Sequence, residues 1–334
     1  MSAARRALLT ALGAWPLAGR AQDGGYLQRA EVQAFVAALV AAHGLPRGWV
    51  ERVLAAGRYS VAAERLSKPA HAPAGRNWLA YRARHVDAQR VREGAAFFRA
   101  QRAWLAAARA RFGVPEEIVT AILGVETQFG RVLGEHRTLD VLLTLAFDYT
   151  RRADFYREEL THFLLLCHER QLDPLALRGS YAGALGLPQF MPSSMRAFAL
   201  DFDGDGRVDL AANAADAIGS VGNYLAACGW QPDLPVVLPA RADRGVLEIL
   251  GRGIRAVYRW RDVAALGVAI DGALDDEARV LLIDLPYLTD DGAAGVQWRI
   301  GTVNFAALLH YNRSYFYAAA VVELAQAIRA RVLA

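Results

Sequence analysis

The sequence predicts a mainly α-helical protein that carries a small β insertion. Apolar residues recur at helical spacing through the first two thirds of the chain, as at Val32, Val36 and Leu39. Short β-type runs replace that spacing between 231 and 298, and helical spacing returns from about 302 to the end. Hydrophobic residues are 54% of the 334 and charged residues 22%, which excludes a disordered chain and suffices for a sizeable core.

The helices follow in chain order. Gly44 and Pro46 end the first apolar stripe, and apolar residues every seven positions from Val91 to Phe112 predict one longer helix that Gly113 ends. Pro115 begins the next helix, with Glu116 and Glu117 in its first turn, where carboxylates oppose the helix dipole. Further helices are predicted at 137–147, 151–171, 193–200 and 216–228. The β-type runs are 235–239, 246–250, 256–260, 280–285 and 296–300.

The N-terminus has the order of a signal peptide, predicted to span 1–21. Arg5 and Arg6 precede an apolar run, and small residues lead to Ala21. A buried N-terminal helix is the alternative. Cleavage would remove three arginines and lower the net charge from +4 to +1, so binding of nucleic acid through bulk charge loses its support. No cysteine follows for a lipid anchor and no apolar run approaches the ~20 residues of a membrane span, so we expect a periplasmic protein.

Cys167 and Cys228 are the only cysteines, and we expect two free thiols. Lys68 is the only lysine, which indicates codon composition rather than selection for an anionic partner. The histidines show no spacing typical of zinc ligands, so a zinc site is not expected.

Glu126 is the first candidate for chemistry. It follows Ile118 and Ile122 at intervals of four, so it lies on an otherwise apolar helix stripe. Partial desolvation there would raise its pKa, as a general acid that protonates a glycosidic oxygen requires. In the alternative interpretation Glu126 points to solvent or pairs with Arg131 at the helix end.

Two further stretches carry polar groups suited to sugars. Residues 179–194 hold three glycines together with Ser180 and Gln189, and residues 310–317 hold a polar and aromatic cluster. Each has a structural alternative: a loop that caps the helix near Pro192, and an N-cap at Ser314.

The stretch 201–216 matches an EF-hand loop in part. Acids stand at loop positions 1, 3, 5 and 9 with glycine at 6, but position 12 is Ala212 rather than the usual bidentate Glu. We expect a structural Ca²⁺, with a solvated acidic turn as the alternative. The predicted ligands are Asp201, Asp203, Asp205, Arg207, Asp209 and Asp216.

Together these stretches resemble the membrane-bound lytic murein transglycosylase B family, glycoside hydrolase family 103, in a soluble periplasmic form. The motifs are Gly124-Val125-Glu126-Thr127, the run from Gly179 to Ser194, and Tyr311-Asn312-x-Ser314-x-x-Tyr317. The resemblance implies a lysozyme-like α core with an N-terminal helical domain and a small β domain. The implied domains are 26–107 (N-terminal), 108–230 and 299–334 (core) and 231–298 (β).

The resemblance also implies site roles and a reaction. Glu126 becomes the only catalytic acid and base, and the sugar-binding residues become Ser180, Gln189, Tyr311, Asn312, Tyr149 and Phe155. Leu187-Pro188 departs from the Tyr-Gly common in relatives, which leaves the shape of that subsite open. The implied enzyme cleaves peptidoglycan glycan strands without a catalytic cofactor and leaves 1,6-anhydromuramic ends, and we expect a monomer.

Two other functions stay open. A hydrolytic muramidase would need a second carboxylate, for which Asp140 and Asp148 are the nearest acids in sequence. A non-catalytic, calcium-dependent glycan-binding protein would keep the groove without the reaction.

Overall fold

The computed structural model describes residues 25–68 and 76–334, so the predicted signal peptide lies outside the described residues. This part of the chain divides into two compact units. The first comprises 25–68, 134–184 and 191–193, and the second 76–133, 185–190 and 194–334. The predicted boundary at 107 does not coincide with this division, because residues 76–107 belong to the same compact unit as 108–133.

The first unit is a small helical body. Its helices are α1 (Ala30–His43), α2 (Arg47–Ala55), α3 (Val61–Ser67), α8 (Thr138–Phe147) and α9 (Ala153–Glu169), with a 3-10 turn at Tyr26–Gln28. The two-residue strands β1 (His136–Arg137) and β2 (Arg178–Gly179) pair antiparallel. Leu142, Phe163 and Tyr26 are among its buried core side chains. Gly44 ends α1 in the left-handed conformation, as the sequence predicts.

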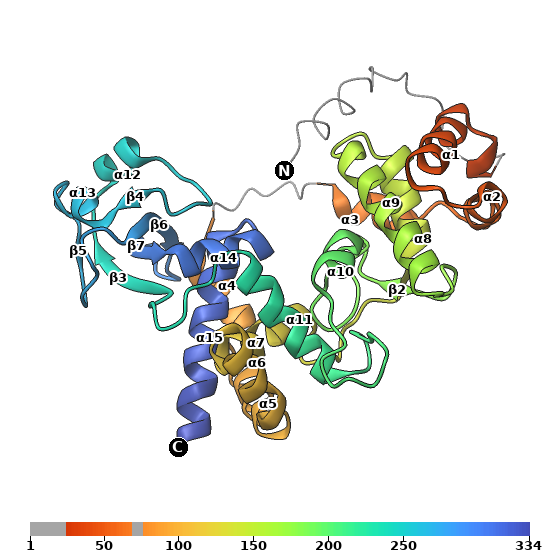
Figure 1. The fold of residues 1–334 in the computed structure, drawn as a ribbon. Helices are drawn as coiled ribbons and strands as arrows, with labels where there is room; N and C mark the ends of the chain where they lie inside the picture. Colours follow the sequence, from red (N-terminus) through yellow and green to blue (C-terminus); the bar gives the residue numbers. More distant parts are fainter. Residues whose placement is uncertain (1–24, 69–75) are drawn as a thin grey trace. The chain divides into compact units, whose positions relative to one another are not determined.

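The second unit packs its helices around α7 (Glu116–Thr127). The neighbours of α7 are α5 (Ala88–Ala100), α6 (Arg102–Phe112), α11 (Ala214–Ala227) and α15 (Tyr315–Leu333). Figure 1 shows α15 running alongside α5 and α7. The unit also contains α4 (Trp78–His85) and α14 (Val303–Tyr311), and α10 (Pro192–Phe198) carries the chain into it from the first unit. Because helices surround it, α7 is apolar on most sides.

The single longer helix predicted between Val91 and Phe112 is wrong, because α5 and α6 are separate helices. Gln101 lies between them with φ −104° and ψ 16°, outside the helical region. The spacing of seven survives the break, because Leu105 is buried and Phe98 and Phe112 are half-buried in the same core. Apolar spacing therefore indicated the buried face without indicating that the helix is interrupted.

The β insertion forms one antiparallel sheet of order β4-β6-β7-β3-β5. Its strands are β3 (Val237–Arg241), β4 (Tyr258–Arg259), β5 (Ala269–Ile270), β6 (Arg279–Leu288) and β7 (Ala294–Thr302). Strand β6 is buried on both faces. Val280 and Leu282 point to the small core of the insertion, and Leu281 and Ile283 to the helical core. That two-sided burial explains the continuous apolar run at 280–285.

The β-type interpretation of 246–250 is wrong, because these residues lie in α12 (Arg244–Leu250). The Asp243 side chain accepts a hydrogen bond from the Val246 N–H at 3.0 Å and so caps the helix. Val246 is buried and Ile249 is exposed, as on a one-sided surface helix. A second short helix of the insertion is α13 (Trp260–Ala264).

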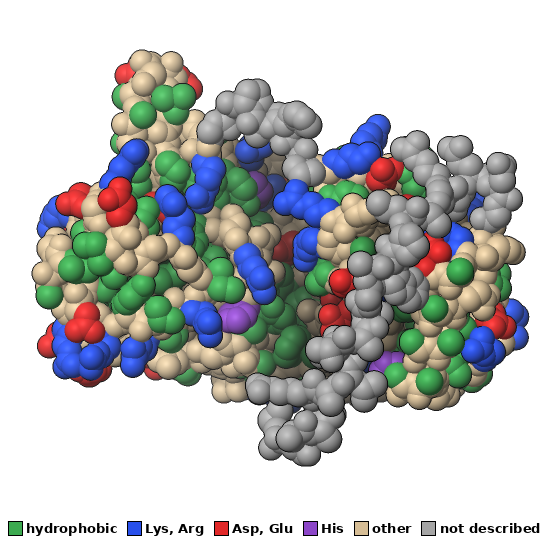
Figure 2. Space-filling view, turned by 90° about the horizontal axis from the view of Figure 1, so that it is seen from above, with side chains coloured by type: hydrophobic (Ala, Val, Ile, Leu, Met, Phe, Trp, Pro, Cys, Tyr) green, Lys and Arg blue, Asp and Glu red, His purple; other side chains and the backbone are tan. Residues whose placement is uncertain are grey.

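The apolar content of the helices, the surface charges and the state of the cysteines agree with what the composition predicts. No helix in the described ranges is both long and apolar enough to span a bilayer. Figure 2 shows basic (Lys and Arg) and acidic side chains interspersed with apolar and neutral ones on the face that it presents. Cys167 is buried and Cys228 half-buried, and both are free thiols, as predicted.

Candidate active site

Glu126 lies one residue before the end of α7, on the stripe that its spacing predicts. Ile118 and Ile122 on this stripe are buried, whereas Glu126 keeps partial exposure and is therefore reachable from solvent. The Tyr317 hydroxyl, from α15, donates a hydrogen bond to Glu126 Oε1 at 2.6 Å. The alternative pairing with Arg131 is wrong, because Arg131 forms its ion pair with Glu93.

The surroundings of the Glu126 carboxyl raise its pKa from 4.5 to about 7. Burial is the larger cause, since the charged form loses hydration, and the Tyr317 hydrogen bond opposes it by stabilising the carboxylate. A group with a pKa near 7 can donate a proton and then accept one at neutral pH. This carboxyl therefore has the proton affinity of an acid–base catalyst.

An aromatic cluster extends from Tyr317. Its ring is stacked with that of Tyr311, with centroids 6.3 Å apart and an interplanar angle of 14°. Tyr311 also contacts Tyr224 and Phe190, at 5.0 Å and 5.8 Å between centroids. Burial raises the pKa values of Tyr311 and Tyr317 well above the ordinary range, so both phenols stay protonated and can donate.

The loop 185–190 is bonded to the C-terminal end of α7 and to Tyr311. The Thr127 hydroxyl lies 3.0 Å from the Leu187 carbonyl oxygen, and the Tyr311 hydroxyl donates to the Pro188 carbonyl. The loop closes on itself through Leu185 and Phe190, which exchange backbone hydrogen bonds of 2.8 Å and 3.0 Å. These bonds hold the loop in one conformation beside Glu126.

Gln189 is held in this loop in the left-handed region, with φ 50°. Its Nε2 donates to the Leu133 carbonyl at 3.2 Å and to the Gly186 carbonyl at 2.9 Å. The amide nitrogen is therefore used to fix the loop, and its amide oxygen is the group left to accept a hydrogen bond from a ligand.

The turn after Glu126 explains why position 124, two residues before Glu126, is a glycine. Gln128, Phe129 and Gly130 all have positive φ, so the chain reverses sharply and packs the Phe129 ring back against α7. A Cβ on Gly124 would lie 2.6 Å from this ring, so only glycine leaves room for it. Phe129 is also stacked on Phe97 at 5.4 Å between centroids, which fixes the C-terminal end of α7.

Three predicted sugar-binding residues belong to the first unit. The Ser180 hydroxyl accepts from the Ala182 and Ala184 N–H groups at 3.3 Å and 3.1 Å. The Tyr149 hydroxyl donates to the Ser67 carbonyl at 2.7 Å, and the Arg152 guanidinium lies 4.1 Å from the ring centroid of Phe155. Each of the three therefore has a local partner within its own unit.

Asn312 lies in the second unit, where it ends α14 and is exposed. Its carbonyl oxygen accepts from Ser314 N–H at 2.7 Å, and Ser314 caps α15 as predicted. Glu126, Gln189, Tyr311 and Asn312 thus belong to one compact unit.

The two acids considered as a second carboxylate have other partners. Asp140 accepts from Arg58 N–H and from Arg137, both at 2.8 Å. Asp148 accepts from Tyr26 and pairs with Arg29. Both acids belong to the first unit, where these bonds give them structural roles.

Two further residues with raised pKa values are not marked by any sequence motif. Tyr81 of α4 is half-buried, and its pKa is raised first by burial and then by the charge of Glu126, which places it in electrostatic contact with the Glu126 carboxyl. Glu159 of α9 is buried and accepts from Ser193 N–H and its hydroxyl at 2.9 Å and 2.6 Å. Tyr81 precedes Glu126 by 45 positions, and no local pattern marks either residue.

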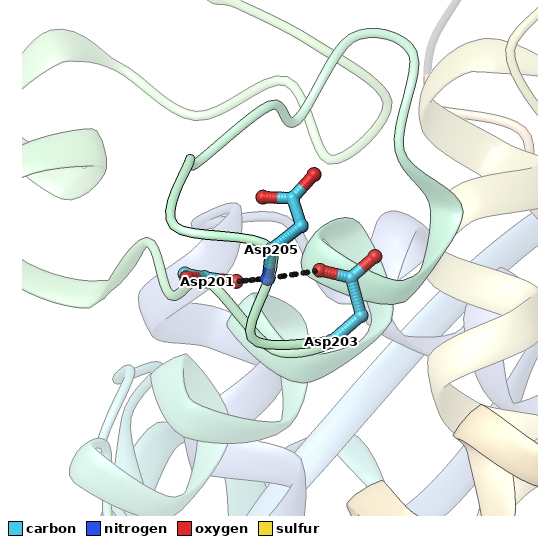
Figure 3. A group of neighbouring side chains, drawn as sticks. All are labelled: Asp201, Asp203 and Asp205. Atoms are coloured by element: carbon cyan, nitrogen blue, oxygen red, sulfur yellow. Dashed lines mark hydrogen bonds between the residues drawn. The ribbon is translucent and has the colours of Figure 1, made fainter.

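Three of the predicted metal ligands converge (Figure 3). Asp201, Asp203 and Asp205 each offer a carboxylate oxygen, and these oxygens lie within 4.8 Å of one another. Asp209 instead caps the following turn through Ala211 and Ala212 N–H, and Asp216 is buried with its oxygens accepting from Phe202 and Asp209 N–H. In the described ranges the converging group does not include these two acids.

The converging carboxylates fit a hard cation in part. Three carboxylates in one turn are oxygen ligands of the kind that Ca²⁺ prefers, and the Arg207 carbonyl stands at the position where such loops supply a backbone oxygen. Ala212 supplies no side-chain oxygen, so the site offers fewer protein ligands than a complete loop. The backbone N–H groups of Gly204 and Gly206 donate to Asp201 at 2.8 Å and hold the turn in shape.

A helical body that presents one partly exposed carboxyl of raised pKa can supply the acid of a glycosidic-bond-cleaving site of the lysozyme-like kind. The chain belongs to the transglycosylase SLT domain family, whose profile matches residues 27–326. It is 37% identical over 314 residues to membrane-bound lytic murein transglycosylase B of Escherichia coli K12, covering 91% of this chain and 84% of the relative.

Solved structures show the same fold. The Escherichia coli lytic transglycosylase Slt35 in complex with calcium has a TM-score of 0.81 at 37% identity, covering 93% of this chain and 96% of that one. SltB3 of Pseudomonas aeruginosa in complex with NAG-anhNAM-pentapeptide has a TM-score of 0.74 at 28% identity, covering 89% and 78%. The predicted family and fold class are confirmed.

Proposed function

We propose that this protein is a lytic transglycosylase that cleaves the β-1,4 bond between N-acetylmuramic acid and N-acetylglucosamine in peptidoglycan. The observation that carries the proposal is the single carboxyl of Glu126 with a pKa of about 7. Among the described residues, burial and Tyr317 account for this pKa, and no second carboxylate contributes. Ordinary glycosidases instead use a pair of carboxylates.

The mechanism uses Glu126 twice. The protonated carboxyl gives its proton to the glycosidic oxygen, and the bond to C1 of muramic acid breaks. The 2-acetamido group of the substrate stabilises the positive charge at C1. Glu126, now a carboxylate, takes the proton of the muramic 6-hydroxyl, whose oxygen attacks C1 and closes the 1,6-anhydro ring. The proton count balances, and no water enters the product.

The other site residues would bind the glycan. Tyr317 holds the Glu126 carboxyl in place, and the Gln189 amide oxygen and the exposed Asn312 side chain can accept or donate to sugar hydroxyl and acetamido groups. Family resemblance assigns Ser180, Tyr311, Tyr149 and Phe155 to the same role. For Ser180 and Tyr149 this requires the hydroxyl to bind sugar in addition to its present partner.

The product decides between transglycosylase and muramidase. Peptidoglycan digested in ¹⁸O-labelled water should give 1,6-anhydromuropeptides without label, since the substrate's own hydroxyl attacks C1. Mass spectrometry of the released muropeptides measures this. Labelled reducing-end muramic acid as the main product would instead establish hydrolysis.

Replacing Tyr317 with Phe should shift the pH profile. The active form of Glu126 is protonated, so kcat/KM, which reports the pKa of the free enzyme, falls as pH rises through about 7. The Tyr317 hydrogen bond lowers the pKa of Glu126, so its loss raises that pKa and moves the falling limb to higher pH. We also expect kcat to drop roughly tenfold because the carboxyl is less well oriented.

Tyr224→Phe is the matched control for this variant. Tyr224 belongs to the same aromatic cluster, but its hydroxyl donates to the His310 carbonyl at 2.8 Å. The falling limb of the pH profile should therefore keep its wild-type position in Tyr224→Phe. A Tyr317→Phe limb that coincides with wild type, or moves to lower pH, would contradict the assignment.

We further propose that the protein acts in the periplasm after export by its N-terminal segment, that it is a monomer, and that the loop at 201–209 binds a structural Ca²⁺. The Asp201, Asp203 and Asp205 cluster supports the calcium proposal, as does the calcium complex of the similar Slt35. Glu126 needs no metal for its proton transfers.

Calcium should raise the melting temperature. An ion that binds only the folded state adds about 0.4 kcal/mol to the unfolding free energy at a concentration equal to its dissociation constant, and about 1.4 kcal/mol at ten times that concentration. With Ala212 in place of a bidentate acid, we expect a dissociation constant on the order of 10⁻⁴–10⁻³ M. Thermal melts in millimolar Ca²⁺ and in chelator measure the shift, which Asp203→Asn with Asp205→Asn should cancel.

The control for the calcium melts is Asp275→Asn with Asp276→Asn, a pair of acids outside the cluster that changes charge equally. This control should keep the calcium shift. Equal wild-type melting temperatures in Ca²⁺ and chelator would make the acidic loop an ordinary surface turn.

A further inference from the structure

The first unit contains a cavity that the proposed mechanism does not use. Its volume is about 430 Å³, and its lining comes from Trp49 of α2 and from residues between 167 and 174, at the end of α9. All of these residues belong to the first unit, whereas Glu126 belongs to the second. The volume lies within the range of about 300–1,000 Å³ that is typical of small-molecule sites.

The wall formed by the end of α9 is held by backbone hydrogen bonds. Gln171 takes the left-handed conformation, with φ 53°, and the Leu172 N–H donates to the Cys167 carbonyl at 2.9 Å. The Asp173 side chain then accepts from the Leu175 N–H at 2.8 Å, which fixes the turn that follows the helix. The cavity is therefore formed before any ligand binds.

One wall of the cavity is aromatic. Trp49 is half-buried, and its ring packs on the core of the first unit. The His168 ring lies against it, with centroids 5.2 Å apart and an interplanar angle of 56°. The C–H groups on one face of a pyranose ring pack well on the electron-rich face of such a ring.

The other wall carries hydrogen-bonding side chains. The Gln171 amide is exposed and forms no hydrogen bond with a described residue, so it can both donate and accept. Asp173 uses Oδ1 for the Leu175 N–H, and its Oδ2 can accept from a ligand hydroxyl. Aromatic and polar walls that face one cavity suit a ligand with one apolar face and several hydroxyl groups.

The chemistry of the lining argues against other ligand classes. Burial, and next the charge of Asp173, raise the pKa of the Cys167 thiol to about 12, so this thiol is neither a nucleophile nor a metal ligand at neutral pH. Among the described residues the lining holds no arginine or lysine that would attract an anion. A wholly apolar ligand would desolvate the Gln171 amide and the Asp173 carboxylate without compensation.

We propose that this cavity is a non-catalytic subsite for an N-acetylhexosamine unit of peptidoglycan, with the sugar ring on Trp49 and its polar groups on Gln171 and Asp173. The choice of this sugar rests on the proposed function. The cell-wall network offers many strands at once, so a second, weak contact would hold the enzyme on the wall between cuts.

Binding is tested without turnover, in the Glu126→Gln enzyme labelled with 5-fluorotryptophan. The protein has seven tryptophans, and the ¹⁹F signal of Trp49 is the one that Trp49→Leu lacks. Adding the N-acetylglucosamine tetramer should shift this signal in a saturable way and leave that of the buried Trp230 unchanged. Gln171→Ala, which alters an exposed side chain, should raise the dissociation constant of that shift at least threefold.

The activity test compares intact sacculi with a soluble NAG-NAM tetrasaccharide, which offers no second strand. In Trp49→Leu with Gln171→Ala, the ratio of kcat/KM on sacculi to kcat/KM on the tetrasaccharide should fall about three- to tenfold. Trp104→Leu is the matched control, because Trp104 is 37% exposed and belongs to the second unit. It should keep this ratio within twofold of wild type. Melting curves show that each variant is folded.

A Trp49 signal that does not move, or that moves equally in Gln171→Ala, would overturn the subsite. An unchanged ratio in Trp49→Leu with Gln171→Ala would overturn its role on the cell wall. Wild-type enzyme that releases no anhydro product from either substrate would instead overturn the proposed function, and the Trp49 signal would still decide whether the cavity binds the sugar.

Discussion

Glu126→Gln should reduce the release of anhydromuropeptides to background. The amide is nearly the same size as the carboxyl but can neither donate nor reclaim the proton. General acid–base catalysis is typically worth about 10²–10⁴-fold, and here one group serves both steps. Glu117→Gln is the matched control, because Glu117 lies in the first turn of the same helix and pairs with Arg329 at the surface. Near wild-type turnover in Glu126→Gln would place the acid elsewhere.

The same variant should be more stable than wild type at alkaline pH. The pKa of Glu126 is about 7 in the folded protein against 4.5 for an ordinary Glu, so the folded state binds the proton more tightly. Stability from that proton is complete below pH 4.5 and is lost as pH rises through 7. The variant should therefore gain up to roughly 3 kcal/mol over wild type at pH 8 and nothing at pH 4. Denaturant unfolding at both pH values measures this.

Gly186→Ala should cost stability and activity together. Gly186 has φ +70°, and a Cβ there would lie 2.6 Å from the Leu210 carbonyl oxygen. The backbone of the loop must then move, and with it Gln189 and the Pro188 carbonyl that holds Tyr311. We expect a loss of roughly 3–4 kcal/mol in unfolding free energy, since backbone strain adds to a clash that no side chain can relieve.

Gly229→Ala separates the cost of the left-handed backbone from the cost of the steric clash. Gly229 has φ +89°, and no atom lies within 4 Å of the Cβ that would be added. Only the left-handed backbone is penalised, so we expect about 1 kcal/mol. Denaturant unfolding of both variants measures the difference, and equal losses would show that the close approach of Leu210 is unimportant.

The periodicity of apolar residues predicted those structural features that depend only on residues close together in the sequence. The intervals of four through Ile118 and Ile122 placed Glu126 on a buried stripe of α7, and the continuous apolar run at 280–285 became a strand buried on both faces. The run 246–250 was misassigned because five apolar-rich residues fit a strand or a helix equally, and the Asp243 cap decides for the helix. Gln101 interrupts the predicted longer helix, and the spacing of apolar residues does not indicate this break because it continues unchanged across it.

By itself the sequence determined the mainly helical class and the β insertion, because these follow from side-chain spacing and short motifs, and it predicted Glu126 as the catalytic acid. The tertiary structure alone decided the hydrogen bond from Tyr317, which is 191 residues from Glu126, and the electrostatic contact with Tyr81. It also showed that Gln189 and Ser180, nine positions apart, belong to different compact units. Such contacts depend on how distant helices pack, and packing is set by the sum of many side chains rather than by any local pattern.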